Sequence, residues 1–139
     1  MVNGRLLPTS VVLLVVDDEP FVLNCVCSVL EHAGFKVLRA ASSAEAQRIA
    51  EEHRAPIHLI LSDVIMPGLT GPSMAERIAE SHPESRLLFM AGLPDHPEVA
   101  DRVLARGHAF LAKPFIPQTL VRKVNELLMP SVQASAATA

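Results

Sequence analysis

Short runs of apolar residues alternate along this chain with longer segments in which apolar residues recur at helical spacing. Val11–Val16 is an unbroken apolar run, and a short run that is apolar on both faces is typical of a central strand in a parallel sheet. Lys36 and Arg39 make the second run more polar, which indicates an edge strand. The pattern therefore predicts five strands, at 11–16, 35–40, 58–62, 86–90 and 109–112.

Each predicted strand is followed by a predicted helix. Proline suits the first turn of a helix, where its missing N–H is no loss, and glycine often ends one. Ser42 and Glu45 have the spacing of a capping box, in which each side chain satisfies a backbone N–H at the start of a helix. The helices are expected to begin at Pro20, after Ser42, and at Pro72, Pro97 and Pro117.

Strands that alternate with helices predict an α/β fold, with a doubly wound parallel sheet and right-handed crossovers. The chain has 139 residues, a length typical of one domain, and it shows no internal repeat. We expect a domain over 11–129, an N-terminal extension over 1–10 and a disordered tail over 130–139.

Composition excludes several classes of protein. Half of the residues are apolar, 12 Lys and Arg oppose 15 Asp and Glu, and the net charge of −3 disfavours direct binding to nucleic acid. Two cysteines are too few for a disulfide scaffold, and the apolar runs are too short to cross a membrane. The start of the chain lacks the small-residue cleavage site of a signal peptide, so a cytoplasmic protein is expected.

Charged residues collect where the predicted strands end. Asp17 and Asp18 follow the first strand, Asp63 the third and Lys113 the fifth, and ligands of such sheets bind at this edge. Clustered carboxylates repel one another unless a cation neutralises them, and their hard oxygen atoms suit Mg²⁺ or Mn²⁺. Asp63 is then a candidate nucleophile toward a phosphoryl group. The alternative is that these aspartates are only helix caps and loop residues.

Three segments of the sequence resemble the signature segments of receiver domains in two-component response regulators. They are Val15-Val16-Asp17-Asp18-Glu19-Pro20, Ser62-Asp63-Val64-Ile65-Met66-Pro67-Gly68-Leu69-Thr70-Gly71 and Lys113-Pro114-Phe115. The resemblance spans about residues 11–128, and the Asp63 segment, like Phe89-Met90-Ala91-Gly92, is similar to receivers that work with hybrid sensor kinases. It implies a flavodoxin-like fold with strand order 2-1-3-4-5.

The resemblance also implies a role for each matching residue. Asp63 would accept phosphate from a phosphohistidine, and Asp17, Asp18, Asp63 and the backbone carbonyl of Ile65 would hold Mg²⁺. Lys113 would bind phosphoryl oxygens, the Lys113–Pro114 peptide bond would be cis, and Phe110 would be the switch aromatic. Ala91 departs from the family, which places Ser or Thr there, so the hydroxyl group of the usual conformational relay is missing, although phosphorylation is still expected.

These implications describe a stand-alone phosphoacceptor that is not a true enzyme beyond its own phosphorylation and slow dephosphorylation. Its donor would be a sensor histidine kinase or a histidine phosphotransfer protein. It would signal through the fourth helix, fifth strand and last helix, to a protein target or a second copy, or pass phosphate on. One rival is a pseudo-receiver that binds partners without phosphate turnover, which Ala91 favours. Another is a Mg²⁺-dependent phosphohydrolase, which Ile65 disfavours because it cannot transfer a proton.

Overall fold

The computed structural model describes residues 11–64, 70–92 and 107–128. Its strands are β1 (Val12–Val16), β2 (Lys36–Ala40), β3 (Leu59–Asp63), β4 (Arg86–Gly92) and β5 (Ala109–Lys113). Its helices are α1 (Pro20–His32), α2 (Ser43–Glu52), α3 (Gly71–Ser81) and α5 (Pro117–Leu128). The helix predicted to begin at Pro97 lies outside the described residues. The other predicted elements are present, and β4 extends two residues beyond its predicted end.

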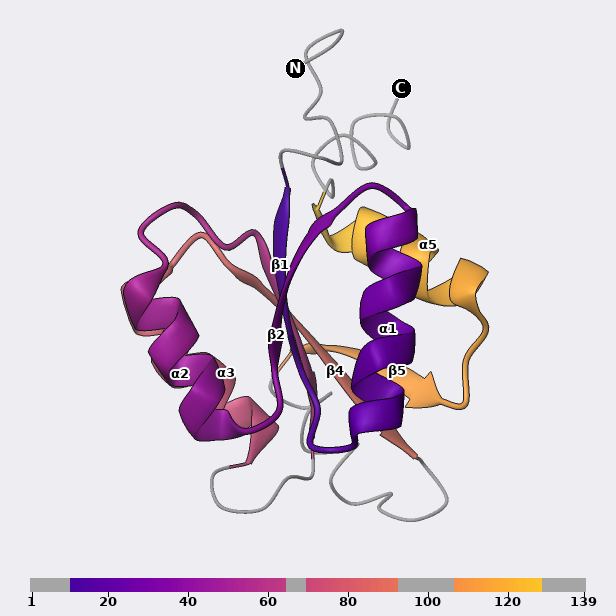
Figure 1. The fold of residues 1–139 in the computed structure, drawn as a ribbon, viewed down its shortest axis with the longest axis horizontal. Coiled ribbons are helices and arrows are strands. Elements are labelled where there is room, and N and C mark those ends of the chain that lie inside the picture. The colour runs from indigo at the N-terminus through magenta and orange to yellow at the C-terminus, as the bar shows by residue number, and fades with distance from the viewer. Residues whose placement is uncertain (1–10, 65–69, 93–106, 129–139) are drawn as a thin grey trace, which may run out of the picture.

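The five strands form one parallel sheet in the order β2-β1-β3-β4-β5, as expected. The helices α1 and α5 cover one face, and α2 and α3 cover the other (Figure 1). All five residues of β1 are buried, because this strand has neighbours on both sides and helices on both faces. The polar strand β2 lies at an edge, which confirms the prediction from Lys36 and Arg39.

The beginnings of the helices follow from local sequence. Pro20 occupies the first turn of α1, and the hydroxyl of Ser42 accepts a hydrogen bond from the N–H of Glu45 at the start of α2. The carboxylate of Glu45 accepts from the N–H of Ala41, one residue earlier than the capping box predicts. Gly34 has a φ of 103°, which suits the end of α1 because glycine adopts this conformation without steric cost.

Two hydrophobic clusters fill the space between the layers. Leu13 and Val15 of β1 face α1 and α5, whereas Leu14 and Val16 face α2 and α3. This alternation is what a strand buried on both faces requires, because successive side chains point to opposite sides. The sheet is thereby held rigidly, and the carboxyl ends of its strands are fixed relative to one another. No helix within the described residues is long and apolar enough to cross a membrane.

Candidate functional site

The charged residues that follow the strands meet at the carboxyl edge of the sheet. Asp17 comes directly after β1, while Asp63 and Lys113 are the last residues of β3 and β5. Because all strands are parallel and β1 and β3 are neighbours, these side chains converge although 96 positions separate Asp17 from Lys113. The prediction that they share one edge is confirmed.

Asp17 is the most enclosed of these groups, since its side chain is fully buried. Its Oδ1 atom accepts a hydrogen bond from the N–H of Glu19 at 2.9 Å, and its Oδ2 atom lies 3.4 Å from Nζ of Lys113. The backbone N–H of Asp17 also donates to the carbonyl oxygen of Ala40 at 3.2 Å. The hydrogen bond from Glu19 is one that aspartates in many loops make, but a buried ion pair with a lysine is not explained by a role in a loop alone. Asp17 is therefore fixed in position by both backbone and side-chain contacts.

Lys113 connects the two strands that carry Asp17 and Asp63. Its Nζ atom lies 3.3 Å from Oδ2 of Asp63, whose side chain is only 15% exposed. Burial by itself lowers the pKa of Lys113, but the carboxylates of Asp63 and Asp17 more than offset this, and the pKa lies above its usual value. Lys113 therefore keeps its positive charge beside Asp63. The peptide bond between Lys113 and Pro114 is cis.

The three carboxylates form an arrangement that fits a divalent cation. One oxygen atom from each of Asp17, Asp18 and Asp63 lies within 4.8 Å of the other two. With the carboxylates ionised and Lys113 protonated, the formal charge is −3 + 1 = −2. A hard divalent ion such as Mg²⁺ both balances this charge and prefers oxygen ligands. Asp18 is exposed, so the site is open to solvent on one side.

Two further residues, Ser62 and Gly71, contact the backbone at the end of β3, and the sequence analysis assigned a role to neither. A Cβ atom on Gly71 would lie 2.0 Å from the carbonyl oxygen of Asp63, so no larger residue fits there. The N–H of Gly71 donates to the carbonyl oxygen of Val64 at 3.0 Å, and the buried hydroxyl of Ser62 donates to that of Asp63 at 2.8 Å. Gly71 thus lets α3 begin directly against the backbone of the candidate phosphoacceptor. The only signal in the sequence was the presence of glycine at this distance from Asp63.

Ala91 and Phe110 lie on the same side of the sheet. Ala91 is buried in the cluster beneath α2 and α3, and the half-buried Phe110 packs against that cluster. Ala91 pairs with Ala112, the residue before Lys113, so it lies on the strand next to the lysine. Its methyl group offers no hydrogen bond to a ligand at this edge. Ile65, whose carbonyl group is a predicted metal ligand, lies outside the described residues.

Within the described residues, the cysteines and histidines do not join this site. Cys25 is exposed and Cys27 is buried. The imidazole of His58 accepts from the N–H of Val12 at 3.0 Å, which is a structural role.

Comparison with known proteins identifies the family. Residues 13–125 match the family model of the response regulator receiver domain. The chain therefore belongs to the receiver domains of two-component response regulators, as its signature segments predicted.

Two proteins of Brucella abortus (strain 2308) illustrate the likeness. The chain is 31% identical to the sensor kinase CckA over 119 residues, which are 86% of this chain but 13% of CckA. It is 29% identical over 118 residues to the response regulator receiver protein CpdR, covering 84% of this chain and 96% of CpdR. The chain thus spans a small part of the first relative and nearly all of the second.

Solved structures agree with this assignment. The receiver domain from the hybrid histidine kinase CckA is similar with a TM-score of 0.71 and 32% identity, over 85% of this chain and 99% of that one. A receiver domain protein from Clostridium thermocellum gives a TM-score of 0.75 and 29% identity, over 89% of this chain and 98% of that one. Domains of this family are generally signalling modules without catalytic activity of their own.

Proposed function

We propose that this receiver domain, over residues 11–129, takes a phosphoryl group from a phosphohistidine onto Asp63. The observation that carries the proposal is the contact of Lys113 Nζ with Asp63 Oδ2 at 3.3 Å, beside two further aspartates. A nucleophilic carboxylate with a fixed cation beside it is suited to phosphoryl transfer, which depends mainly on positioning and charge stabilisation.

The transfer replaces one bond to phosphorus by another. A carboxylate oxygen of Asp63 forms the new O–P bond as the N–P bond to the donor histidine breaks, and the electron pair of that bond stays with the imidazole. Lys113 binds the negative oxygens of the transferring group, while Asp17, buried and hydrogen-bonded to Glu19, keeps the lysine in place.

Mg²⁺, with Mn²⁺ as a substitute, would be held by Asp17, Asp18 and Asp63. When bound it supplies positive charge that stabilises the phosphoryl oxygens. The match between the net −2 charge of the site and a divalent ion supports this part of the proposal.

The donor is a sensor histidine kinase or a histidine phosphotransfer protein, since the relatives of this chain include a sensor kinase and a receiver protein. The signal leaves through the surface of β5 and α5 together with the predicted fourth helix, to a protein target or a second copy, or phosphate itself is passed on. Ala91 removes a hydroxyl whose hydrogen bond to a charged group is worth about 1.5–3 kcal/mol. Phosphorylation is therefore expected to move Phe110 little.

The same alanine supports a second candidate function, a pseudo-receiver that binds partners without phosphate turnover. One experiment separates the two. The protein is incubated with a small-molecule phosphodonor and Mg²⁺, and its intact mass is measured by mass spectrometry. The proposal predicts one added phosphoryl group in the wild type and in Glu84→Gln, a control far from the site, and none in Asp63→Asn. No added mass in the wild type would favour the pseudo-receiver, and unchanged labelling of Asp63→Asn would refute the assignment of the acceptor.

A further inference from the structure

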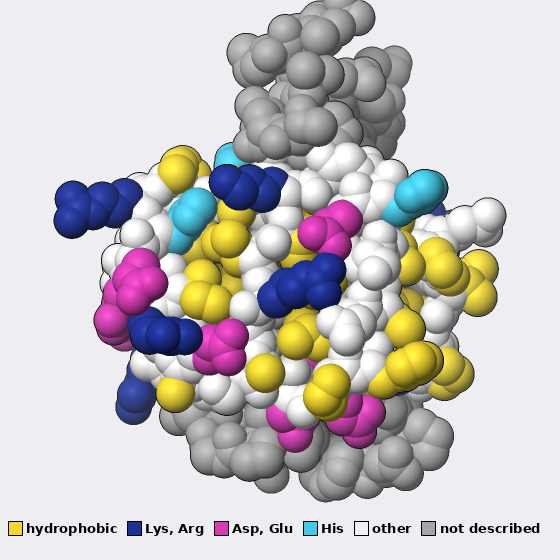
Figure 2. All heavy atoms as spheres, viewed as in Figure 1, with side chains coloured by type: hydrophobic (Ala, Val, Ile, Leu, Met, Phe, Trp, Pro, Cys, Tyr) yellow, Lys and Arg dark blue, Asp and Glu magenta, His cyan; other side chains and the backbone are white. Residues whose placement is uncertain are grey.

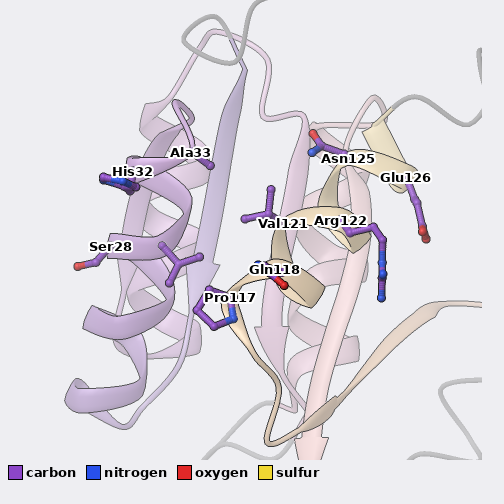
Figure 3. A pocket seen from close by; sticks show the side chains of 10 residues that line it. Ser28, His32, Ala33, Pro117, Gln118, Val121, Arg122, Asn125 and Glu126 are labelled. Atoms are coloured by element: carbon purple, nitrogen blue, oxygen red, sulfur yellow. The ribbon is translucent and has the colours of Figure 1, made fainter.

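The two layers of helices differ in how closely they are packed. Between α1 and α5 lies a groove of about 1070 Å³, and Figure 3 shows Val121 of α5 pointing across it toward α1. Figure 2, drawn in the orientation of Figure 1, shows hydrophobic side chains at the surface on the side where these helices lie. On the other face, α3 begins at Gly71, where a Cβ atom would lie only 2.0 Å from the carbonyl oxygen of Asp63. The end of β3 is therefore held closely from the face that α3 covers.

Ser62 lies on this closely packed face. Ile60 belongs to the cluster beneath α2 and α3, and side chains two positions apart in a strand point to the same side. The hydroxyl group of Ser62 is next to α3, since its oxygen would lie 2.9 Å from a Cβ atom on Gly71. Ser62 is fully buried, and its hydroxyl group donates a hydrogen bond to the carbonyl oxygen of Asp63 at 2.8 Å. A buried polar side chain is thus bonded to the backbone of the candidate phosphoacceptor.

The peptide group that joins Asp63 to Val64 is fixed at both of its polar atoms. Its carbonyl oxygen accepts from Ser62 and lies against Gly71, and its N–H donates to the carbonyl oxygen of Met90 in β4 at 3.0 Å. Because both groups are bonded, the plane of this peptide group is held in one orientation. The side chain of Asp63 projects from the opposite side of the strand to that of Ser62. The fixed backbone therefore sets where the carboxylate of Asp63 lies.

We propose that Ser62 is a positioning residue for phosphoryl transfer, which holds the backbone of Asp63 so that its carboxylate faces Lys113. This inference rests on the function proposed above. The carboxylate lies 3.3 Å from Nζ of Lys113, and phosphoryl transfer depends mainly on such positioning. A misplacement of about 1 Å can lower a rate by about 100-fold. A serine with a purely structural role would contribute to stability and leave the rate unchanged.

Phosphorylation kinetics with acetyl phosphate and Mg²⁺ test this role. Ser62→Thr and Ser62→Val introduce side chains of nearly equal size, of which only threonine has a hydroxyl group. The maximal rate of Ser62→Val should be about ten-fold lower than that of Ser62→Thr. The donor concentration that gives half of the maximal rate should agree within about two-fold, because Ser62 does not contact the donor. Equal maximal rates in the two variants would overturn the proposal.

Ser85→Ala is the matched control for the loss of a hydroxyl group. The hydroxyl of Ser85 also donates to a backbone carbonyl, that of Ile57, but at the opposite end of the sheet. Urea unfolding should show that Ser62→Ala and Ser85→Ala are both less stable than the wild type. Only Ser62→Ala should be phosphorylated more slowly. If Ser62→Ala is destabilised but phosphorylated as fast as Ser85→Ala, its hydroxyl group has a structural role alone and the proposal is wrong.

NMR without a phosphodonor separates this inference from the proposed function. The signals of the carbonyl and carboxyl carbon atoms of Asp63 should both differ between Ser62→Val and Ser62→Thr, whereas Ser85→Ala should leave them as in the wild type. A carboxyl signal that is the same in Ser62→Val and Ser62→Thr would contradict the positioning role. A wild type that takes no phosphoryl group would instead refute the proposed function, and the NMR comparison would still decide whether Ser62 orients Asp63.

Discussion

The two ends of the sheet both hold charged side chains, but they differ in how these charges are balanced. At the carboxyl end, the described residues bring the carboxylates of Asp17, Asp18 and Asp63 together, and the ammonium group of Lys113 lies beside Asp17 and Asp63. Negative charge is in excess there, and Asp18 opens to solvent. This end is arranged to receive cations and a phosphoryl group.

At the opposite end, His82 belongs to a cluster of hydrogen-bonded polar groups with Glu84 and Ser85. Its Nε2–H donates to the carbonyl oxygen of Ala50 at the end of α2 (2.8 Å), and its Nδ1 atom lies 3.1 Å from Oε2 of Glu84. The same Glu84 oxygen accepts from the N–H of Ile57, and the hydroxyl of Ser85 donates to the carbonyl oxygen of Ile57. The polar groups of this cluster have partners within the protein, most of them in the backbone.

Because the charges are balanced differently, substitutions in the two groups of polar residues should have different effects on stability and on ligand binding. Where buried polar groups are satisfied by backbone partners, removing one leaves another unpaired and lowers the free energy of unfolding. Where like charges are held together, removing one relieves repulsion and mainly alters what the site binds. Variants of the carboxylates at the carboxyl end and variants of the polar cluster at the opposite end should therefore have opposite profiles.

The largest effect on stability is expected from Gly71→Ala. The added methyl group would lie 2.0 Å from the carbonyl oxygen of Asp63, so the backbone must shift, at a cost of about 3 kcal/mol. Gly107→Ala is the matched control, because nothing lies within 4 Å of its Cβ and only its positive φ of 78° is unfavourable, which costs about 1–2 kcal/mol. Urea unfolding compares the two, and equal losses would contradict the close approach at Gly71.

His82→Ala should lower the free energy of unfolding by about 2 kcal/mol, since the carbonyl group of Ala50 and the carboxylate of Glu84 both lose a partner. Phosphorylation of Asp63 should reach the wild-type level, because the cluster lies at the far end of the sheet. The exposed neighbour Ser81 provides the control, and Ser81→Ala should change stability by less than about 0.5 kcal/mol. A His82→Ala variant with wild-type stability but no phosphorylation of Asp63 would contradict this prediction.

Glu84→Gln should show a smaller effect that depends on pH. Partial burial by itself raises the pKa of Glu84, but hydrogen bonds from its own N–H, from His82 and from the N–H of Ile57 lower it overall. A lowered pKa in the folded state contributes stability above the unfolded value of 4.5, and this contribution is lost as the pH falls through the folded value. The stability difference between wild type and variant should be greatest near neutral pH and shrink in acid. A stability difference that grows as the pH falls would contradict a lowered pKa of Glu84 in the folded protein.

Asp18→Asn should have the smallest effect on stability, within about 0.5 kcal/mol, because its side chain is exposed. Its effect on metal binding should be large, with the affinity for Mg²⁺ falling about ten-fold or more. Glu19→Gln, an exposed acid next in the chain and outside the trio, should bind Mg²⁺ almost as the wild type does. Calorimetric titration of both variants decides this, and equal affinities would place the metal elsewhere.

Much of the fold was predictable because its signals are local. A run such as Val11–Val16 is apolar on both faces only where a strand is buried on both, and prolines and caps locate the starts of helices. The convergence of Asp17, Asp63 and Lys113 followed from strand direction alone, and the resemblance to receiver domains assigned their roles.

What escaped prediction depends on contacts between distant segments. The φ of Gly71 is not positive. Glycine is required at this position because the carbonyl oxygen of Asp63 lies too close to admit a Cβ atom. His82 was given no role because its partner Ala50 contributes only a backbone carbonyl, which leaves no pattern in the sequence. Phe21 is a large apolar residue, yet its side chain is 79% exposed. It precedes the buried Leu23 by two positions, about 200° around the helix.

The central claim is that Asp63, and not its neighbours Asp17 or Asp18, carries the phosphoryl group. An acyl phosphate is reduced by borohydride to an alcohol, which marks the acceptor permanently. After phosphorylation with a small-molecule donor and Mg²⁺, reduction and proteolysis, peptide mass spectrometry should find position 63 converted to homoserine and positions 17 and 18 unchanged. Conversion at position 17 or 18 in place of 63, or no conversion in a sample shown by intact mass to be phosphorylated, would contradict the account.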